Sequence, residues 1–397
     1  MPHPRLFVDV HVLQTVPPAN LNRDDQGNPK EAYFGGVRRS RVSSQAWKRA
    51  TRMHFTERMA ADDLATRTRR FSGDLAARLR RRTGLPEKSA DRLANALVTA
   101  LGITPGKKQG DTAYLFFYGH RQLDAVAELV ADRAAELDAL PDKELKKQIE
   151  ELDAQQHFRS GQPLDIALFG RMVADIPALR VDAATQVAHA LSTHAVELEF
   201  DYFTAVDDRV EKDQESGAGM IGTIGFNSAT LYRYATVGLH QLRHNLRGDA
   251  TDATDATGAD HDGAAVQGVA EFVTSFARSV PSGYKNSFAH RTLPSLVAVV
   301  VRGDQPVNLV SAFEEPVAAS SGIATRSAQR LAREHAVSVS TWGDVPSWAG
   351  ACHSFDAESA AGAELTGAFG APVSFPGLLS GLREHLSGRV AEAGAVR

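Results

Sequence analysis

The order in which two hydrophobic periodicities occur along the chain limits its fold more than any other feature. Residues 6–13, LFVDVHVL, alternate between two faces and are rich in β-branched side chains, which predicts a half-buried strand. From about residue 60 to 180 the composition changes to Ala, Leu, Arg, Glu and Lys with Gly and Pro at intervals, which predicts helices. Strand-like segments return from residue 181. We therefore expect one sheet built from two separated parts of the chain, with a helical block inserted between them.

Outside the helical block, the expected elements follow the order strand, helix, strand, strand, helix, strand. The first helix should begin at Ser43 or Ser44, because either hydroxyl can cap a helix N-terminus. The second covers residues 264–280 and ends before Pro281, and a buried strand follows at 295–302. This order predicts an α+β fold whose core is ferredoxin-like, or RNA-recognition-motif-like.

These expectations divide the chain into four parts. The sheet-forming core takes residues 1–59 and 181–345, the helical domain takes 60–180, and the weakly patterned C-terminal segment 346–397 has no assigned role. Within the core we expect two further features, which are a hairpin at about 197–226 and a low-complexity acidic loop with three DAT triplets, expected to be disordered, at about 248–264.

Several classes of protein are excluded by composition. No run of about 18 uncharged apolar residues occurs, so we expect no membrane-spanning segment. Arg5 and Asp9 interrupt the apolar N-terminus, which argues against a secretory signal. The single cysteine, Cys352, excludes an internal disulfide and a cysteine-based zinc site. We expect a globular protein of the reducing cytoplasm.

The charge is unevenly distributed along the chain, although its net value is only −4. Residues 30–54 carry seven basic groups and one acid, and residues 67–82 carry seven arginines and one aspartate. Residues 197–215 instead carry eight acids and two bases. Because a polyanion responds to the local field, a slightly acidic chain can still present a basic groove.

The densest basic segment, YFGGVRRSRVSSQAWKRATR at 33–52, has the features of a phosphate-binding site. Its double glycine, Gly35 and Gly36, would let the backbone approach a ligand closely. The expected helix start offers hydroxyls and free N–H groups at the positive end of the dipole. Ala46, Ala50 and Met53 share one face of the expected helix, and the polar and cationic side chains of Gln45, Lys48, Arg49 and Arg52 share another. The alternative is a solvated helix face.

Other motifs fail their context tests. The G-x-G-x-x-G at 217–222 follows a charged stretch rather than a strand, which favours a hairpin tip over a dinucleotide site. The P-loop-like, S-x-x-K and His-x-x-x-His patterns lack their companion residues. Asp24 and Asp25 could hold a divalent ion for phosphodiester cleavage, but a turn or an ion pair with Arg23 is the simpler interpretation. We expect no cofactor, no metal and no catalytic residue.

Four separated segments together resemble one family. They are LNRDD at 21–25, FGGVRRSRVSSQAWKRA at 34–50, DIALFGRM at 165–172 and FDYFTAVDD at 200–208. They are similar to the repeated backbone subunit of the type I-E CRISPR surveillance complex, Cascade, in the RAMP superfamily. The resemblance implies a palm with an RNA-recognition-motif-like core, a helical finger domain and a β-hairpin thumb. It also implies assembly along a guide RNA, which the thumb kinks at intervals, displacing a base.

The resemblance further implies RNA-binding residues and partners. Tyr202 stands where the family has a Trp, so an aromatic surface is kept. The expected partners are crRNA, target DNA paired with the guide, other copies of this chain and other Cascade subunits, without a membrane. Acidic thumb residues such as Asp207, Asp208 and Glu211 could meet a neighbour's arginines within 67–82. The expected RNA-binding set is Asn22, Arg23, Lys30, Arg38, Ser43, Ser44, Gln45, Lys48, Arg49, Arg52, Arg171, Met172, Tyr202, Phe203, Thr204 and Val206.

Two other functions compete with guide binding. A nuclease of the same superfamily would use Asp24 or Asp25 with a divalent ion, or a histidine such as His11 as general acid and base. A structural adaptor would instead use the basic face to bind an acidic protein.

Overall fold

The computed structural model of the protein describes residues 5–159, 161–173, 175–206, 218–247 and 258–395. The chain forms two compact units. The sheet unit comprises Met1–His54, Gln186–Thr236 and Val269–Arg397, and the helical unit comprises Phe55–Thr185 and Val237–Gly268. The helical unit lies close to the expected block 60–180 but also takes in residues 237–268, which are distant in sequence. The fold is α+β, as predicted.

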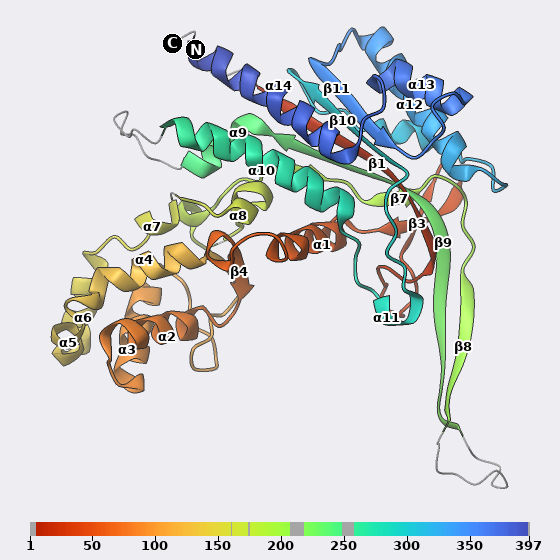
Figure 1. Ribbon diagram of the computed structural model, residues 1–397. Helices are drawn as coiled ribbons and strands as arrows, with labels where there is room; N and C mark the ends of the chain where they lie inside the picture. The colour runs from red at the N-terminus through yellow and green to blue at the C-terminus, as the bar shows by residue number, and fades with distance from the viewer. Residues whose placement is uncertain (1–4, 160, 174, 207–217, 248–257, 396–397) are drawn as a thin grey trace. The chain divides into compact units, whose positions relative to one another are not determined.

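The sheet unit is organised around one sheet with the strand order β11-β10-β1-β9-β7-β3-β2 (Figure 1). The pair β1 and β10 is antiparallel and in register from Phe7↔Arg302 to Leu13↔Leu296. The short strand β6 (Thr185–Val187) also pairs with β9. The strands of the main path are β1 (Phe7–Ala19), β2 (Glu31–Phe34), β3 (Val37–Val42), β7 (Ala190–Ser192), β9 (Ala218–Gly238), β10 (Leu296–Arg302) and β11 (Trp348–His353).

Helices cover both faces of this sheet. One face packs against α12 (Ile323–Trp342), α13 (Ala360–Phe369) and the short helix η3 (Leu309–Phe313). The other face packs against α1 (Ser44–Thr56) and the later part of α10 (Gly258–Arg278). At the β11 edge, α14 (Phe375–Ala395) lies over the strand, so that any side chain at Gly350 would contact Leu378. The short helix α11 (Lys285–Phe288) completes the unit.

Strand β1 is buried on both faces, so the expectation of a half-buried strand was wrong. Its polar residues Asp9 and His11 are fully buried beside the cluster beneath α12 and α13. They are tolerated there because they are hydrogen bonded. Tyr234 donates to Asp9 at 2.9 Å, and Tyr232 Oη lies 2.9 Å from His11 Nδ1. The alternation of apolar and polar residues along β1 therefore reflects two buried faces, one apolar and one that contains hydrogen-bonded polar side chains.

A buried charge network continues from Asp9. The guanidinium of Arg302 lies 3.2 Å from Asp9, ion-pairs with Asp344 and lies 3.4 Å from Nδ1 of His335. Burial raises the pKa of Asp9 to about 6, against the opposing effect of its hydrogen bonds and Arg302. Burial and Arg302 lower the pKa of His335 to about 4. The network therefore carries neutral imidazole at neutral pH and ties β1 and β10 to α12.

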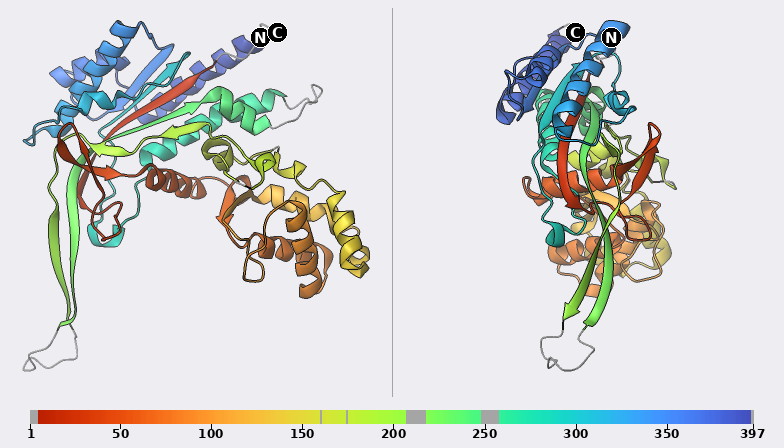
Figure 2. Two further views of the ribbon diagram at one scale, coloured as in Figure 1. Left: turned by 180° about the vertical axis from the view of Figure 1, so that it is seen from behind. Right: turned by 90° about the vertical axis from the view of Figure 1, so that its right-hand side faces the viewer.

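A long hairpin extends from the sheet. It consists of β8 (Glu199–Val206) and the first part of β9, paired from Glu199↔Phe226 onward (Figure 2). Strand β9 begins at Ala218, within the range 197–226 that was expected to form a hairpin. The tip, with Asp207, Asp208, Glu211 and Gly217, lies outside the described residues. Gly222 has a structural role, because a side chain there would come within 2.4 Å of the Phe203 ring on the paired strand.

The helical unit has its own core, centred on aromatic side chains. Phe71 contacts Phe116, Tyr118 and Phe158, with ring centroids 4.9, 5.1 and 6.0 Å apart. A two-stranded sheet, which the sequence did not indicate, is formed by β4 (Ala65–Thr68) and β5 (Phe116–Gly119). The helices are η1 (Ala61–Asp63), α2 (Phe71–Thr83), α3 (Glu87–Ala100), α4 (His120–Ala131), α5 (Ala134–Ala139), α6 (Asp142–Glu150), α7 (Gln156–Arg159), α8 (Leu164–Phe169), η2 (Pro177–Leu179) and α9 (Leu239–Arg247).

Two regions are more ordered than expected. The segment 346–397 supplies β11, α13 and α14 to the sheet unit. Helix α10 begins at Gly258, so residues 258–264 belong to a helix rather than to the acidic loop. The Arg243 guanidinium favours this helix start, because it forms a paired contact with Asp262 at 2.6 and 2.7 Å. None of the helices in the described ranges is long and apolar enough to cross a membrane.

We expect acid to destabilise the sheet unit through His335. The unfolded chain takes up the imidazole proton near pH 6.5, whereas the folded protein does so near pH 4. The contribution of His335 to stability is therefore complete above about pH 6.5 and is lost as the pH falls toward 4. His335→Gln should remove about 3 kcal/mol of this pH-dependent loss.

Urea unfolding followed by tryptophan fluorescence at pH 7.5, 5.5 and 4.5 measures this effect. All three tryptophans, Trp47, Trp342 and Trp348, belong to the sheet unit. The control is His244→Gln, at an exposed position on α9. Equal pH dependence in His335→Gln and the wild type would show that the network does not govern acid stability.

Candidate nucleic-acid interface

Helix α1 begins where the sequence predicted. The Ser43 carbonyl accepts from the N–H groups of Ala46 and Trp47 at 3.0 and 3.2 Å, and Ser43 Oγ lies 3.4 Å from the Ala46 nitrogen. The Ser43 N–H donates to Oδ1 of Asn22 at 2.9 Å. Ser43 is buried, whereas Ser44 is partly exposed at the first helical position. Asn22 and Ser43 therefore set the helix start, and Ser44 lies at its accessible end.

The two faces of α1 differ in chemistry. The buried face consists of Trp47, Thr51, His54 and Phe55, whereas the apolar face of Ala46, Ala50 and Met53 stays partly exposed. Thr51 is accommodated because its hydroxyl lies 3.5 Å from Oγ of Ser279, directly after α10, and His54 because its Nδ1 lies 2.9 Å from Oγ of Ser275 on α10. Two polar residues, Thr51 and His54, therefore lie on the buried face of α1.

The opposite face of α1 presents the predicted side chains. Gln45 and Arg49 are exposed, and Lys48 and Arg52 are half-buried at its margin. Burial lowers the pKa of Lys48. Among the residues that the structure describes, no carboxylate forms an ion pair with Lys48 or Arg49. Lys48 and Arg49 can therefore accept an anion without first breaking an internal salt bridge.

A buried arginine fixes this helix from beneath. The Arg233 guanidinium of β9 lies 3.7 Å from the Trp47 ring centre and 4.6 Å from that of Phe276 on α10. It donates to Gln14 Oε1 at 2.6 Å and to the Phe276 carbonyl. Burial lowers the pKa of Arg233 to about 9, which still leaves it charged at neutral pH. The stack joins α1, α10 and the sheet.

The cations of the β2–β3 hairpin have different roles. Arg39 is fully buried and donates to the carbonyls of Ser192 and Phe313 at 2.9 and 2.8 Å. Arg38 is exposed but pairs with Glu31 at 2.5 Å. Arg41 is partly exposed, lies 3.2 Å from His189 Nδ1 and has no carboxylate partner within the described part of the chain. The basic run is thus partly structural.

The double glycine of this hairpin serves the protein rather than a ligand. Gly35 and Gly36 both have positive φ, 61° and 76°, and form the turn between β2 and β3. A side chain at Gly35 would collide with the Glu314 carbonyl oxygen. The close backbone approach that we expected toward a ligand is therefore an internal contact.

The loop before β2 is tightly held. Asp24 Oδ1 accepts from the N–H groups of Gln26 and Asn28, both at 2.9 Å, so this carboxylate closes a turn. Arg23 is exposed and lies 4.7 Å from the Tyr284 ring centre. The Lys30 N–H donates to the Asn22 carbonyl, which leaves the partly exposed Lys30 side chain beside the start of α1.

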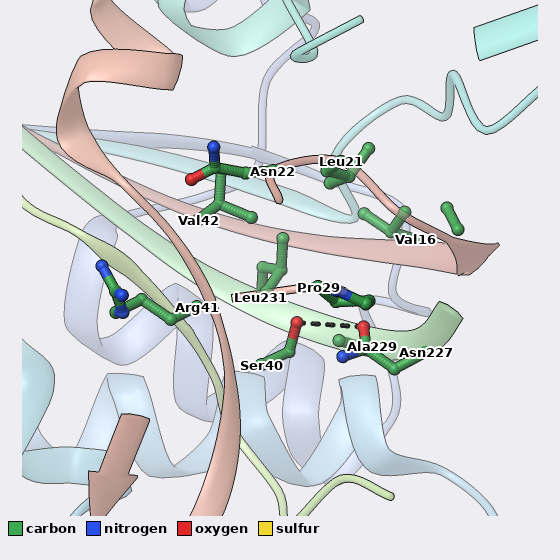
Figure 3. Close-up of a pocket in the computed structure, with 11 residues that line it drawn as sticks. Val16, Leu21, Asn22, Pro29, Ser40, Arg41, Val42, Asn227, Ala229 and Leu231 are labelled. Atoms are coloured by element: carbon green, nitrogen blue, oxygen red, sulfur yellow. Dashed lines mark hydrogen bonds between the residues drawn. The ribbon is translucent and has the colours of Figure 1, made fainter. Parts of the chain in front are cut away.

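A small cavity lies under this loop (Figure 3). It is lined by side chains that include Val16, Leu21 and Leu231, and Ser40 donates to Asn227 at its edge. Its volume of about 10 Å³ suits one water molecule and excludes a nucleobase. Any RNA contact at this place must therefore be on the surface.

The hairpin presents aromatic surface. Tyr202 is 64% exposed and Phe203 is 36% exposed, with its ring against Gly222. Thr204 is also exposed, whereas the side chain of Val206 lies outside the described part of the structure. Alternation along β8 puts Tyr202 and Thr204 on one face of the hairpin and Phe203 on the other.

Two neighbouring candidate RNA-binding residues of the helical unit, Arg171 and Met172, differ in exposure. Met172 is 81% exposed, which is unusual for a large apolar side chain. Arg171 is buried and donates to the carbonyls of Leu179 and Phe158 at 2.7 and 2.6 Å. Burial lowers its pKa to about 10. Arg171 therefore holds the loop that presents Met172 and does not reach a ligand.

The described residues do not assemble the alternative catalytic sites. His11 is buried in the sheet, away from any substrate, and Asp24 is committed to its turn. Across the described ranges, no group of three His, Cys, Asp or Glu side chains is arranged to hold a metal ion.

Comparison with known proteins places this geometry in a family. A family model described as CT1975-like protein matches residues 8–371. The chain belongs to the CT1975-like protein family. The match spans most of both units and ends before α14. No curated protein matches the chain.

Two solved structures resemble this family member over nearly its whole length. A chain of a CRISPR RNA-guided surveillance complex, pre-nicking, is 32% identical, with a TM-score of 0.77, and the match covers 96% of this chain and 100% of that one. A chain of another CRISPR RNA-guided surveillance complex is 29% identical, with a TM-score of 0.68 and coverage of 96% and 99%.

Sequence reasoning missed two residues that shape this region of the CT1975-like fold, His189 and Arg233. It did not connect Arg41 with His189, which are far apart in sequence, and it did not find Arg233 under α1. No local pattern separates Arg38, Arg39 and Arg41, because their different burial comes from residues near 192 and 313. The only available signal was the presence of three arginines in one short segment.

We expect Arg233→Ala to lower the free energy of unfolding of the sheet unit by about 3 kcal/mol, since it leaves a cavity between two rings and unpaired buried acceptors. Urea unfolding monitored by tryptophan fluorescence measures the change. The control Arg333→Ala removes an exposed cation of α12 and should leave stability nearly unchanged. Similar effects of the two substitutions would contradict a bracing role for Arg233.

Proposed function

We propose that this protein is a non-catalytic backbone subunit of a type I-E Cascade-like CRISPR surveillance complex, in the RAMP superfamily. It would bind crRNA, oligomerise along the guide and present bases for pairing with target DNA in the cytoplasm. The observation that carries the proposal is the cationic face of α1, on which Lys48 and Arg49 form no ion pair with a described carboxylate and which Arg233 holds against the sheet. The similarity to chains of RNA-guided surveillance complexes supports it.

The arrangement of the sheet supports the proposed palm. The strands β10, β1, β9 and β7 are adjacent in that order. Taking them as the four core strands in chain order, this is the antiparallel 4-1-3-2 sequence of a ferredoxin-like sheet, with α1 and α10 as its two helices. The helical unit would then be the fingers and the β8–β9 hairpin the thumb.

Guide binding of this kind should not depend on sequence. Lys48, Arg49 and the N–H groups at Ser44 can contact phosphates, which all guides share. Tyr202, Phe203 and Met172 offer apolar surfaces on which bases can stack or be displaced. Other residues remain candidate RNA contacts, namely Asn22, Arg23, Lys30, Arg38, Gln45, Arg52 and Thr204. The buried side chains of Arg171 and Ser43 instead stabilise the local structure.

The first test removes the cations of α1. Lys48→Gln with Arg49→Gln should weaken binding of an unstructured single-stranded RNA about tenfold at physiological salt. The slope of log affinity against log salt should fall by about 1.4, for two lost phosphate contacts. Fluorescence anisotropy over a salt series provides both values.

The matched control for this test is Arg333→Gln with Arg389→Gln. It removes the same charge from α12 and α14, where each arginine pairs with a glutamate. If the control and the α1 variant lose the same affinity, general electrostatics explains the result and α1 is not the site. Unchanged affinity in the α1 variant would also reject the proposal.

The second test concerns the hairpin. Tyr202→Ser should abolish displacement of guide nucleotides in the assembled particle while leaving the fold intact, because Tyr202 is exposed. Acylation of the guide 2′-hydroxyls would reveal displaced nucleotides as regularly spaced reactive positions. Asp201→Asn, on the opposite face of β8, should preserve them. Regular reactivity that persists in Tyr202→Ser would assign the displacement to another side chain.

A further inference from the structure

A second cationic group lies on the sheet unit outside α1. Arg41 on β3 and His189, immediately before β7, place Nη1 and Nδ1 3.2 Å apart. The pairing of β3 with β7, Arg41↔Leu191 and Val42↔Ala190, fixes this contact. Lys30 is the third member, since its carbonyl accepts from the Arg41 N–H at 2.8 Å. Three basic residues therefore share one part of the surface.

This group is not neutralised within the described part of the chain. Arg41 Nε donates to the backbone carbonyl of Glu31 at 3.1 Å, while the Glu31 carboxylate pairs with Arg38. No described carboxylate forms an ion pair with Arg41 or Lys30. Burial, followed by the charges of Arg41 and Lys30, lowers the pKa of His189. The surface thus holds an excess of positive charge that an anion would relieve.

The geometry leaves donors available to such an anion. A neutral His189 accepts from Arg41 through Nδ1, so its Nε2–H is free to donate from an exposed ring. In Figure 3 the Arg41 guanidinium points away from the apolar side chains of the cavity. The planar guanidinium and the imidazole N–H can therefore both face one tetrahedral anion.

We propose that Arg41, His189 and Lys30 bind one phosphodiester group of the guide RNA, and that His189 takes up a proton when the phosphate binds. This inference rests on the proposed function and extends it by one phosphate site. The position favours RNA over an acidic protein, because Arg41 lies two residues before the Ser43 cap. The site therefore lies next to the N-terminal end of α1, where we propose that phosphates bind.

The sign of the pH dependence follows from the contacts. In the free protein, the charges of Arg41 and Lys30 disfavour the imidazolium, and the carboxylate of Glu31 pairs with Arg38. A bound phosphate favours the imidazolium and raises the pKa of His189. RNA affinity should therefore rise as the pH falls through the pKa of the complex. A rise of one pKa unit corresponds to about tenfold in affinity.

The test measures the affinity of the full-length protein for an unstructured single-stranded RNA between pH 7.5 and 5.5. His189→Ala should bind nearly as well as the wild type at pH 7.5 but lose about tenfold of the gain on acidification. Arg41→Gln should lower the salt slope by about 0.7. Arg333→Gln is the control and should retain both the pH gain and the slope. His189 labelled at ¹³Cε1, and assigned by its loss in His189→Ala, should titrate at higher pH with RNA present.

The outcomes separate this site from the proposed function. RNA binding with the same pH dependence in His189→Ala and the wild type overturns the site alone. A His189 resonance that responds to a glutamate-rich peptide but not to RNA also overturns it, in favour of an acidic protein partner. A wild-type protein that binds no RNA at any of these pH values overturns both proposals.

Discussion

A single buried guanidinium connects the sheet to the surface where ligands can bind. Arg233 lies between the rings of Trp47 and Phe276, and its N–H groups reach Gln14 and a backbone carbonyl of α10. A cation between two aromatic faces is attracted most strongly when water is excluded, as it is here. Because Trp47 belongs to α1, this interaction acts together with the contacts of Thr51 and His54 to hold one face of the helix inward. This orientation in turn decides that Gln45 and Arg49 face outward and that Lys48 lies at the margin.

The arginines of this protein divide into two groups that composition cannot distinguish. Arg39, Arg171 and Arg233 are buried and donate to backbone carbonyls. Arg41 and Arg49 remain at the surface without an acidic partner among the described residues. A slightly acidic chain can thus present a basic surface, because many of its acids are already paired with other cations. The local field at α1 and β3 depends on this sorting rather than on net charge.

The sequence predicted the parts of the fold that depend on local pattern. The strand 295–302, the second core helix and the start of α1 were all found, because apolar runs, Pro281 and serine caps act over a few residues. It failed where the deciding contact is distant. Ala46, Ala50 and Met53 share an apolar face, yet Thr51 and His54 lie on the buried face because serines more than 200 residues away supply hydrogen bonds. Likewise, Asp9 and His11 looked solvent-facing because their partners lie on β9 and near β10.

The same logic explains why the candidate site could be predicted only in part. Its cations are visible in the sequence, but the availability of each cation depends on which of them the fold uses internally. Arg38, Arg39 and Arg41 lie on one strand of six residues but make three different kinds of contact. Arg38 forms an ion pair with Glu31, Arg39 is buried and donates to backbone carbonyls, and Arg41 contacts His189. A surface that binds phosphates of any sequence needs charge without competition from internal acids. Such a surface is therefore defined by the cations that the fold leaves without a carboxylate partner.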